Sequence, residues 1–275
     1  MRVTIGIIVA LATVALTPCF SQGPPNAKIQ ALCDATLAAL QKTDAPPMVD
    51  TLSGQSSSLI VVTESGLVRT CKSKLKGQAT WTATAPLSAA AKLTEAKATP
   101  GSDATHVEAT VDDGGKQGKL DGMALIEGGK GRWLMLALVP QAADSGSDAD
   151  RAAIGAHLDA LRQNLTKGDM DAAVKAFAPD FLSFSVAGPD YGFYAFPTPP
   201  EVRAFLVGQA TAAGPLDVPP AQPPQLEFHG PVALGYGMWD ITVATFPVQP
   251  TEIRWHLYRE GDAWKVAAVC ALRKD

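Results

Sequence analysis

Two segments of the chain, residues 27–44 and 152–169, are versions of one helical sequence. The first reads AKIQALCDATLAALQKTD and the second AAIGAHLDALRQNLTKGD, with eight identities in eighteen positions at a constant offset of 125. A second similar pair, residues 126–139 and 258–271, has a glycine-containing turn followed by a tryptophan (Trp133 or Trp264) and a final apolar strand. Because both landmarks recur in the same order, the sequence predicts a tandem duplication of one folding unit.

Residues 1–21 have the pattern of a secretory signal peptide. Arg2 precedes an apolar run of about 14 residues that ends at Pro18, and this run is too short to span a bilayer as a helix. The small residue Ser21 precedes the predicted cleavage point. We therefore expect an exported protein, periplasmic or secreted, with no membrane span. Residues 16–19 also resemble a lipoprotein cleavage site, in which Pro18 replaces the usual small residue.

Composition restricts the partners. The net charge of −4 and the absence of a basic stretch argue against nucleic acid as a partner. Once the signal peptide is removed, Cys33, Cys71 and Cys270 remain; either Cys33 pairs with Cys71 or all three are separate buried thiols. No spacing of Cys and His is typical of a metal site, so we expect no metal and no cofactor.

The chain divides into units at residues 27–140 and 151–275, joined by a polar linker at 141–150. Each unit opens with an amphipathic helix. In the second unit, Gly168 is predicted to end the helix and Asp169 to cap a further turn. Thr198 and the following prolines predict a helix to about residue 209. Strands are predicted at 58–64, 67–73, 106–111, 119–127, 132–139, 181–186, 225–229, 232–246, 252–259 and 263–272. Residues 46–52 are a candidate short helix, 188–200 are predicted as a loop, and 87–100 have no clear pattern.

Four stretches, residues 153–181, 198–206, 233–243 and 253–269, resemble the nuclear transport factor 2-like family, also called SnoaL-like. The resemblance implies an α+β fold of two tandem cone-shaped domains, each a curved antiparallel sheet wrapped around helices, with the first unit degenerate. The family includes isomerases, dehydratases and members without known activity, so the fold alone does not assign a function. Members commonly pair through their sheets. A homodimer or an intramolecular pseudo-dimer is therefore possible, with His229, Arg254, His256 and Tyr258 at the interface.

Aromatic residues are the candidates for a binding site. Tyr191, Phe193 and Tyr194 lie in the predicted loop, where they either rim an apolar pocket or plug the open end of the cone. Trp239 and Trp255 lie on the apolar face of their strands, as pocket wall or as core. A small apolar ligand is the predicted partner of this set.

Histidines and one aspartate are the candidates for acid–base chemistry. Strict alternation places His106, His229 and His256 on the polar faces of their strands, away from the predicted pocket, as solvated or interface residues. His157 borders the buried stripe of its helix and is interpreted as structural. Alternation also places Asp240 toward solvent or a dimer contact, although a buried Asp there would be a candidate base. No catalytic residue can be assigned.

The sequence thus favours a non-catalytic module for ligand binding or protein interaction. The alternative is an isomerase- or hydratase-like enzyme in the C-terminal cone, using Asp240, His157 or a loop tyrosine.

Overall fold

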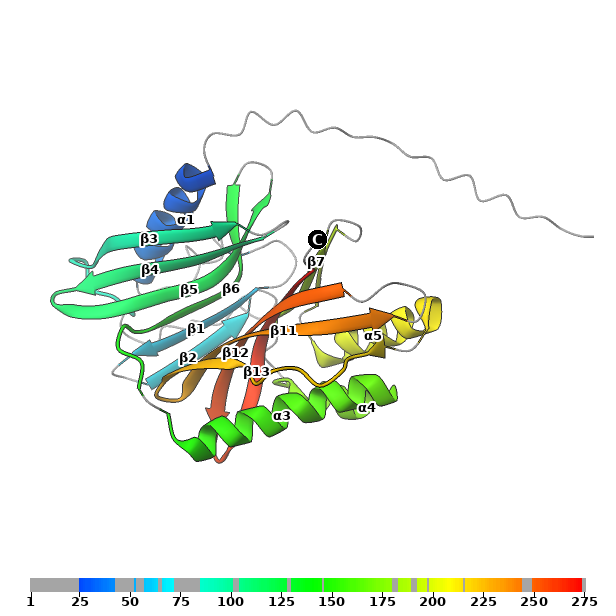
Figure 1. The fold of residues 1–275 in the computed structure, drawn as a ribbon. Coiled ribbons are helices and arrows are strands. Elements are labelled where there is room, and N and C mark those ends of the chain that lie inside the picture. The colour runs from blue at the N-terminus through cyan, green and yellow to red at the C-terminus, as the bar shows by residue number, and fades with distance from the viewer. Residues whose placement is uncertain are drawn as a thin grey trace, which may run out of the picture.

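Two β-sheets pack face to face, with helices on their outer sides (Figure 1). The computed structural model describes residues 25–42, 52, 57–63, 66–71, 85–100, 104–127, 130–144, 146–179, 183–188, 192–196, 198–214, 216–243 and 249–273. The predicted signal peptide and most of the candidate helix at 46–52 lie outside them. Helix α1 (Pro25–Leu40) packs on the first sheet. Helices α3 (Asp148–Lys167), α4 (Met170–Ala173) and α5 (Pro199–Ala213) pack on the second.

The first sheet has the order β2-β1-β6-β5-β4-β3. Its strands are β1 (Ser58–Thr63), β2 (Gly66–Cys71), β3 (Lys92–Pro100), β4 (Thr105–Asp113), β5 (Lys116–Glu127) and β6 (Lys130–Pro140). Strand β3 lies in the segment that has no clear sequence pattern. It is an edge strand whose side chains are mostly exposed, which explains why the segment lacks a strong apolar alternation.

The second sheet repeats this arrangement with the order β8-β7-β13-β12-β11-β10. Its strands are β7 (Ser183–Gly188), β8 (Gly192–Phe196), β10 (Gln225–His229), β11 (Val232–Val243), β12 (Gln249–Glu260) and β13 (Ala263–Arg273), with the short β9 (Leu216–Asp217) beside β11. The two sheets therefore have the same topology: when they are aligned from β2 and from β8, strands at matching positions occur in the same order along the chain.

Three sequence predictions need correction. The sheets are mixed and not purely antiparallel, because β1 pairs parallel to β6 and β7 parallel to β13. Each parallel pair is separated by a long stretch of chain, which parallel pairing requires. The predicted loop at 188–200 contains strand β8, paired antiparallel with β7, since its aromatic residues favour a strand. Helix α3 begins inside the predicted linker, because the Ser147 side chain accepts a hydrogen bond from the backbone N–H of Asp150.

Other local predictions are confirmed. Gly168 ends α3 with a left-handed φ of 74°, and the Asp169 side chain accepts a hydrogen bond from the Ala172 N–H at the start of α4. Helix α5 starts after Thr198, whose hydroxyl donates to the Glu201 carboxylate. Cys33 and Cys270 are buried free thiols, so the alternative of separate thiols applies to Cys33. The side chain of Cys71 lies outside the described residues.

Each sheet has an apolar core on its helix side. A tryptophan of the last strand reaches the opening helix in each half: the Trp133 indole N–H donates to Thr36 Oγ1 at 2.7 Å, and that of Trp264 to Asp150 Oδ1 at 3.1 Å. Two smaller apolar clusters lie between the sheets, one around Ile60, Val139 and Tyr258 and one around Met123, Met135 and Cys270. The sheets therefore contact each other directly, and the site described next lies in the same interface.

Candidate functional site

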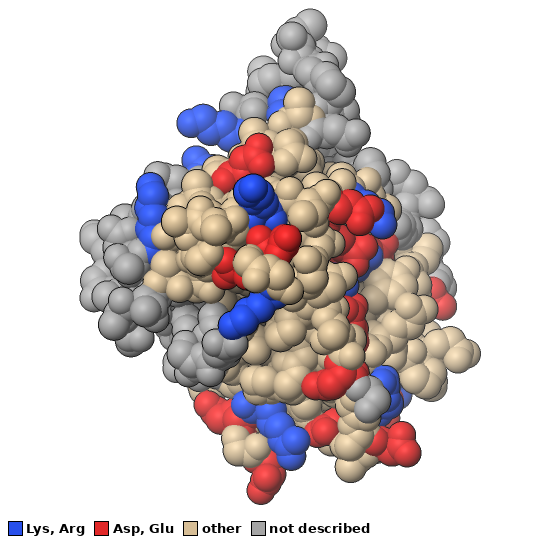
Figure 2. Space-filling view, turned by 90° about the vertical axis from the view of Figure 1, so that its left-hand side faces the viewer, with Lys and Arg blue, Asp and Glu red and all other residues tan. Residues whose placement is uncertain are grey.

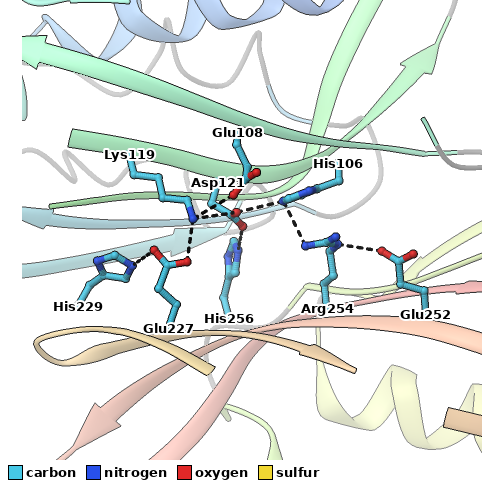
Figure 3. A network of polar contacts seen from close by, with 9 residues as sticks. All are labelled: His106, Glu108, Lys119, Asp121, Glu227, His229, Glu252, Arg254 and His256. Atoms are coloured by element: carbon cyan, nitrogen blue, oxygen red, sulfur yellow. Dashed lines mark hydrogen bonds and ion pairs between the residues drawn. The ribbon is translucent and has the colours of Figure 1, made fainter. Parts of the chain in front are cut away.

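A network of charged and polar side chains lies between the two sheets (Figure 3). The first sheet contributes four residues from β4 and β5, and the second contributes five from β10 and β12. They are His106, Glu108, Lys119 and Asp121 on the first sheet and Glu227, His229, Glu252, Arg254 and His256 on the second. Three of the chain's four histidines are in this group. Strict alternation creates the site, because the residues between them on each strand point to the helix-covered cores.

Asp121 is the centre of the network. Its side chain is only 11% exposed, and its Oδ2 lies 3.0 Å from His106 Nε2. On the other side, His256 Nε2 lies 3.6 Å from Asp121 Oδ1. Burial alone would raise the pKa of Asp121, but the contacts with His106 and His256 outweigh it and hold the pKa well below its usual range. Asp121 is therefore an ionised carboxylate in a nearly dry environment.

Lys119 is the cation nearest to this carboxylate. Its ammonium lies 2.8 Å from Glu227 Oε2, 3.0 Å from Glu108 Oε1 and 3.9 Å from Asp121 Oδ2. Burial would lower the Lys119 pKa, but the hydrogen bonds to Glu227 and Glu108 and the charge of Asp121 raise it overall. The Lys119 ammonium thus forms ion pairs with three carboxylates, two on the first sheet and one on the second.

Arg254 extends the network along β12. Its Nε donates to Glu252 Oε1 at 3.0 Å, and its guanidinium lies over the Tyr236 ring at 4.9 Å. Its Nη1 lies 3.2 Å from His106 Nε2, the same nitrogen that faces Asp121.

His229 and His256 are the most deeply buried imidazoles. His229 Nε2 lies 3.0 Å from Glu227 Oε1, and this hydrogen bond is the main cause that lowers the pKa of Glu227. Neither ring nitrogen of His256 has a hydrogen-bond partner among the described residues, and its side chain is 1% exposed. Burial lowers the pKa of His256, so the ring is neutral.

The network is reached from solvent through a cleft of about 410 Å³. The cleft is bordered by both sheets, and its charged lining residues are Glu108, Lys119, Asp121, Glu227 and Arg254. A smaller cleft of about 160 Å³ adjoins it, lined by Glu95, Lys97, Glu108, Lys119 and Glu227 among others. Charged side chains line both clefts, and Leu226, Leu234 and Tyr236 also border the larger one. The buried charges favour a small charged species over an apolar one.

The structure confirms the side of the sheet to which three histidines were predicted to point. Alternation correctly placed His106, His229 and His256 away from the helix-covered face. They are buried between the two sheets, so the alternative of solvated histidines is wrong. His157 is part-buried on α3, and its Nε2 donates to the Ala176 carbonyl at 2.9 Å, a structural role. Asp240 is exposed on β11.

The predicted aromatic site is only partly described. Trp239 and Trp255 lie together on the helix-covered face of the second sheet, with ring centroids 5.6 Å apart and both rings in the core cluster. Phe193 and Tyr194 lie on β8, but their side chains are outside the described residues, as is Tyr191.

Sequence reasoning missed Lys119 and Asp121. The signal was present in the strand KLDGMALIE, where two charges share one face with Met123 and Leu125. Charged residues on the same face as buried apolar ones indicate a face that is covered by another part of the protein.

One outer face of the molecule has both signs of charge mixed together. Figure 2 shows Lys and Arg side chains interspersed with Asp and Glu over the face that it presents. No described helix is long and apolar enough to cross a membrane.

Comparison with known proteins gives a likeness of fold. No family model and no curated protein matches the chain. The solved structures that it resembles are nuclear transport factor 2-like and cystatin-like proteins, as the sequence resemblance predicts, and each match covers about 46% of this chain. A nuclear transport factor 2-like protein from Novosphingobium aromaticivorans is 18% identical, covered over 83% of its length, with a TM-score of 0.39 over 46% of this chain. One of unknown function from Pseudomonas putida is 16% identical, covered over 87%, with a TM-score of 0.40 over 46% of this chain.

Proposed function

We propose that this chain is an exported, non-catalytic binding module of two tandem units. The units pair sheet to sheet as an intramolecular pseudo-dimer, and the C-terminal cone holds a small apolar ligand. The supporting observation is the division of side chains across the second sheet. Its inter-sheet face carries the titratable residues, including His229, Arg254 and His256, whereas its helix-covered face carries Trp239 and Trp255.

The pseudo-dimer is supported by topology. Both sheets have the same strand order, and β5 and β12 occupy the same position in it. These two strands supply Asp121 and His256, which face each other across the interface. In a two-fold arrangement equivalent elements meet at the axis, as expected of an isologous contact. With its sheet face already covered in this way, the full chain is expected to be a monomer in size-exclusion chromatography with light scattering.

The apolar ligand is supported by the composition of the second core. The Trp239 and Trp255 rings form a tilted aromatic pair. Gly235 and Gly237 on β11 let the Trp255 ring lie close to this strand, because a Cβ atom at either glycine would come within 3.1–3.2 Å of the ring. Phe196 of β8 packs on Phe205 of α5 at 4.7 Å, which joins the aromatic strand to this end of the cone. We assign Tyr191, Phe193 and Tyr194 to the rim of the same site.

Binding of the neutral apolar dye N-phenylnaphthylamine tests this assignment. The full chain is expected to enhance the dye's fluorescence saturably, and Trp239→Leu should weaken binding at least about tenfold, as loss of a large aromatic contact does. Trp133→Phe in the first core is the matched control and should bind as the wild type does. Equal effects of the two variants, or no saturable binding, would reject the apolar site.

Two of the candidates for the enzyme alternative, Asp240 and His157, lack the surroundings of a catalytic group; the side chains of the loop tyrosines lie outside the described residues. Asp240 is exposed, and the ring of His157 is occupied by the Ala176 carbonyl. Within the described part of the chain, neither residue is paired with a second polar side chain in the manner of a general acid and base.

Export can be tested separately. When the full sequence is expressed in a secreting bacterial host, the mature protein is expected in the periplasm or medium with Gln22 as its first residue. N-terminal sequencing would show this. An N-terminus before residue 22 in a cytoplasmic protein would contradict export, and a lipid-modified Cys19 would identify the lipoprotein alternative.

A further inference from the structure

His106 Nε2 has two neighbours that require opposite protonation states of this nitrogen. It lies 3.0 Å from a carboxylate oxygen of Asp121 and 3.2 Å from a guanidinium nitrogen of Arg254. The ionised carboxylate can only accept a hydrogen bond, and the guanidinium can only donate one. A ring nitrogen is either protonated or not, so one of the two contacts is always mismatched.

His256 shows the same deficiency from the opposite sheet. Its imidazole is almost fully buried, neither ring nitrogen has a hydrogen-bond partner among the described residues, and Nε2 points at Asp121 from 3.6 Å (Figure 3). Leaving a buried polar group unsatisfied costs about 1–3 kcal/mol, so such a group needs an explanation. One cation placed between these groups would satisfy both imidazoles and the carboxylate.

We propose that His106, Asp121 and His256, together with Glu108, bind a divalent first-row transition-metal ion of the Zn²⁺ type between the two sheets. The ligand atoms of His106, Glu108 and Asp121 already lie within 4.8 Å of one another. Ligand atoms on a tetrahedral zinc ion are separated by about 3.3 Å, from metal–ligand distances near 2.0–2.1 Å. The separations of 3.0 Å and 3.6 Å from Asp121 to the two imidazoles lie on either side of this value.

The ligand set selects the class of ion. Imidazole nitrogens combined with carboxylates suit Zn²⁺ and its transition-metal neighbours. Ca²⁺ and Mg²⁺ prefer oxygen ligands alone. The ion would use two nitrogens that the hard cations bind poorly.

The two neighbouring cations, Lys119 and Arg254, keep other partners when the ion binds. Lys119 would lose Glu108 to the metal but keep Glu227 at 2.8 Å. Arg254 would lose its mismatched contact with His106 and keep Glu252 at 3.0 Å and the Tyr236 ring. Glu108, half-exposed at the cleft, is the ligand through which the ion can enter.

The site would also join the two halves of the chain. His106, Glu108 and Asp121 belong to the first sheet and His256 to the second. An ion held by both sheets binds only the folded, paired chain, so its binding free energy adds to the stability of that state.

The test uses the full chain, stripped with a chelator and titrated with ZnCl₂ by calorimetry and by thermal unfolding. We expect one equivalent of Zn²⁺ to bind and to raise the unfolding midpoint, with little response to CaCl₂. His256→Ala should weaken Zn²⁺ binding at least about tenfold, since even outer residues of metal sites cost 10–100-fold when changed. His229→Ala is the matched control, because His229 is equally buried between the sheets but bonds Glu227.

A measurement on the unaltered chain keeps the proposal testable if the variants fail to fold. Pulsed electron paramagnetic resonance of the Cu²⁺-loaded protein should show two coordinated imidazoles. A folded wild type that binds neither Zn²⁺ nor Cu²⁺, a signal from one imidazole or none, or equal binding by wild type and His256→Ala would each overturn the site.

Discussion

Lys119 Nζ on the first sheet lies 2.8 Å from Glu227 Oε2 on the second, and this ion pair ties together residues 108 positions apart in the chain. Its surroundings distinguish it from a surface pair. The Lys119 side chain is 12% exposed and also serves Glu108 and Asp121. An ion pair in this position resists screening by salt and fixes the relative placement of the two sheets.

Removing this ammonium should destabilise the fold. Lys119→Met leaves Asp121 and Glu108 without their nearest cation, and we expect the free energy of unfolding to fall by roughly 1.5–3 kcal/mol, the range for hydrogen bonds to charged groups. Chemical denaturation measures this. The exposed pair of Lys97 with Glu95 is the control; Lys97→Met should leave the denaturation midpoint unchanged. If both variants behaved alike, the inter-sheet pair would have no special role.

A second prediction concerns the contact between Trp133 and α1. Thr36 is buried, and its Oγ1 accepts from the Trp133 indole and donates to the Leu32 carbonyl at 2.7 Å. Thr36→Val keeps the shape but removes both bonds, and should cost about 1–3 kcal/mol because the indole N–H stays buried without a partner. Thr36→Ser keeps the hydroxyl and should lose less. Urea denaturation measures the free energy of unfolding of both variants. A smaller loss of stability for Thr36→Val than for Thr36→Ser would contradict the role assigned to these hydrogen bonds.

The elements of this fold were predictable where one side is apolar. The stripes of α1 and α3, the capping at Gly168 and Asp169, and the alternation of β10 to β13 each follow from local chemistry. The exposed edge strand β3 and the aromatic strand β8 were not, because the first lacks an apolar face and the second lies in a Gly- and Pro-rich segment.

The candidate site could be predicted only in part. Alternation showed that His229 and His256 leave the helix-covered face, but nothing local in the sequence specifies what covers the other face. The approach of Asp121 to His256 depends on how two sheets from distant segments pack. Ligand spacing in sequence cannot reveal such a cluster, and the expectation of no metal used that spacing alone.

Stability should depend on the protonation of His157. Burial lowers the pKa of this residue below its ordinary value of 6.5, although the bond to the Ala176 carbonyl opposes the shift. Above pH 6.5 the His157 ring is neutral in both the folded and the unfolded chain, and its contribution to the free energy of unfolding is fully present. Below this the unfolded chain takes up a proton that the folded chain resists, so stability falls as the pH falls through the lower, folded value. His157→Gln can still donate to Ala176, and its free energy of unfolding should decline less steeply than the wild type's between pH 7 and about pH 5. Parallel curves would contradict the assignment.

The two described cysteines should be inert in the folded protein. Burial raises the pKa of Cys33 to about 11 and that of Cys270 to about 12, so neither forms the reactive thiolate near neutral pH. We expect iodoacetamide to label both only after unfolding, as peptide mass spectrometry would show. Rapid labelling of either in the native chain would contradict their burial. Failure to label Cys33 after unfolding without reductant would indicate a disulfide with Cys71.

Gly122 on β5 makes room for the Trp133 ring. A Cβ atom added at Gly122 would lie 2.5 Å from the Met135 carbonyl oxygen and 2.9 Å from two ring carbons of Trp133. The backbone oxygen belongs to the paired strand β6, so it cannot move without disturbing the ladder. Gly122→Ala should therefore destabilise the fold by about 1–3 kcal/mol, as overpacking does.

Gly118 on the same strand provides the control. Its nearest neighbour to an added Cβ is Leu138 Cδ1 at 3.5 Å, an ordinary contact. Gly118→Ala should change stability by no more than about 0.5 kcal/mol. Because the clash at Gly122 displaces the indole, the Ala variant at that position should also alter the near-ultraviolet circular dichroism, whereas the Gly118 variant should not. Equal stability of the two variants would mean that Trp133 can shift without cost, and the close packing of this tryptophan against β5 would then not be essential to the first core.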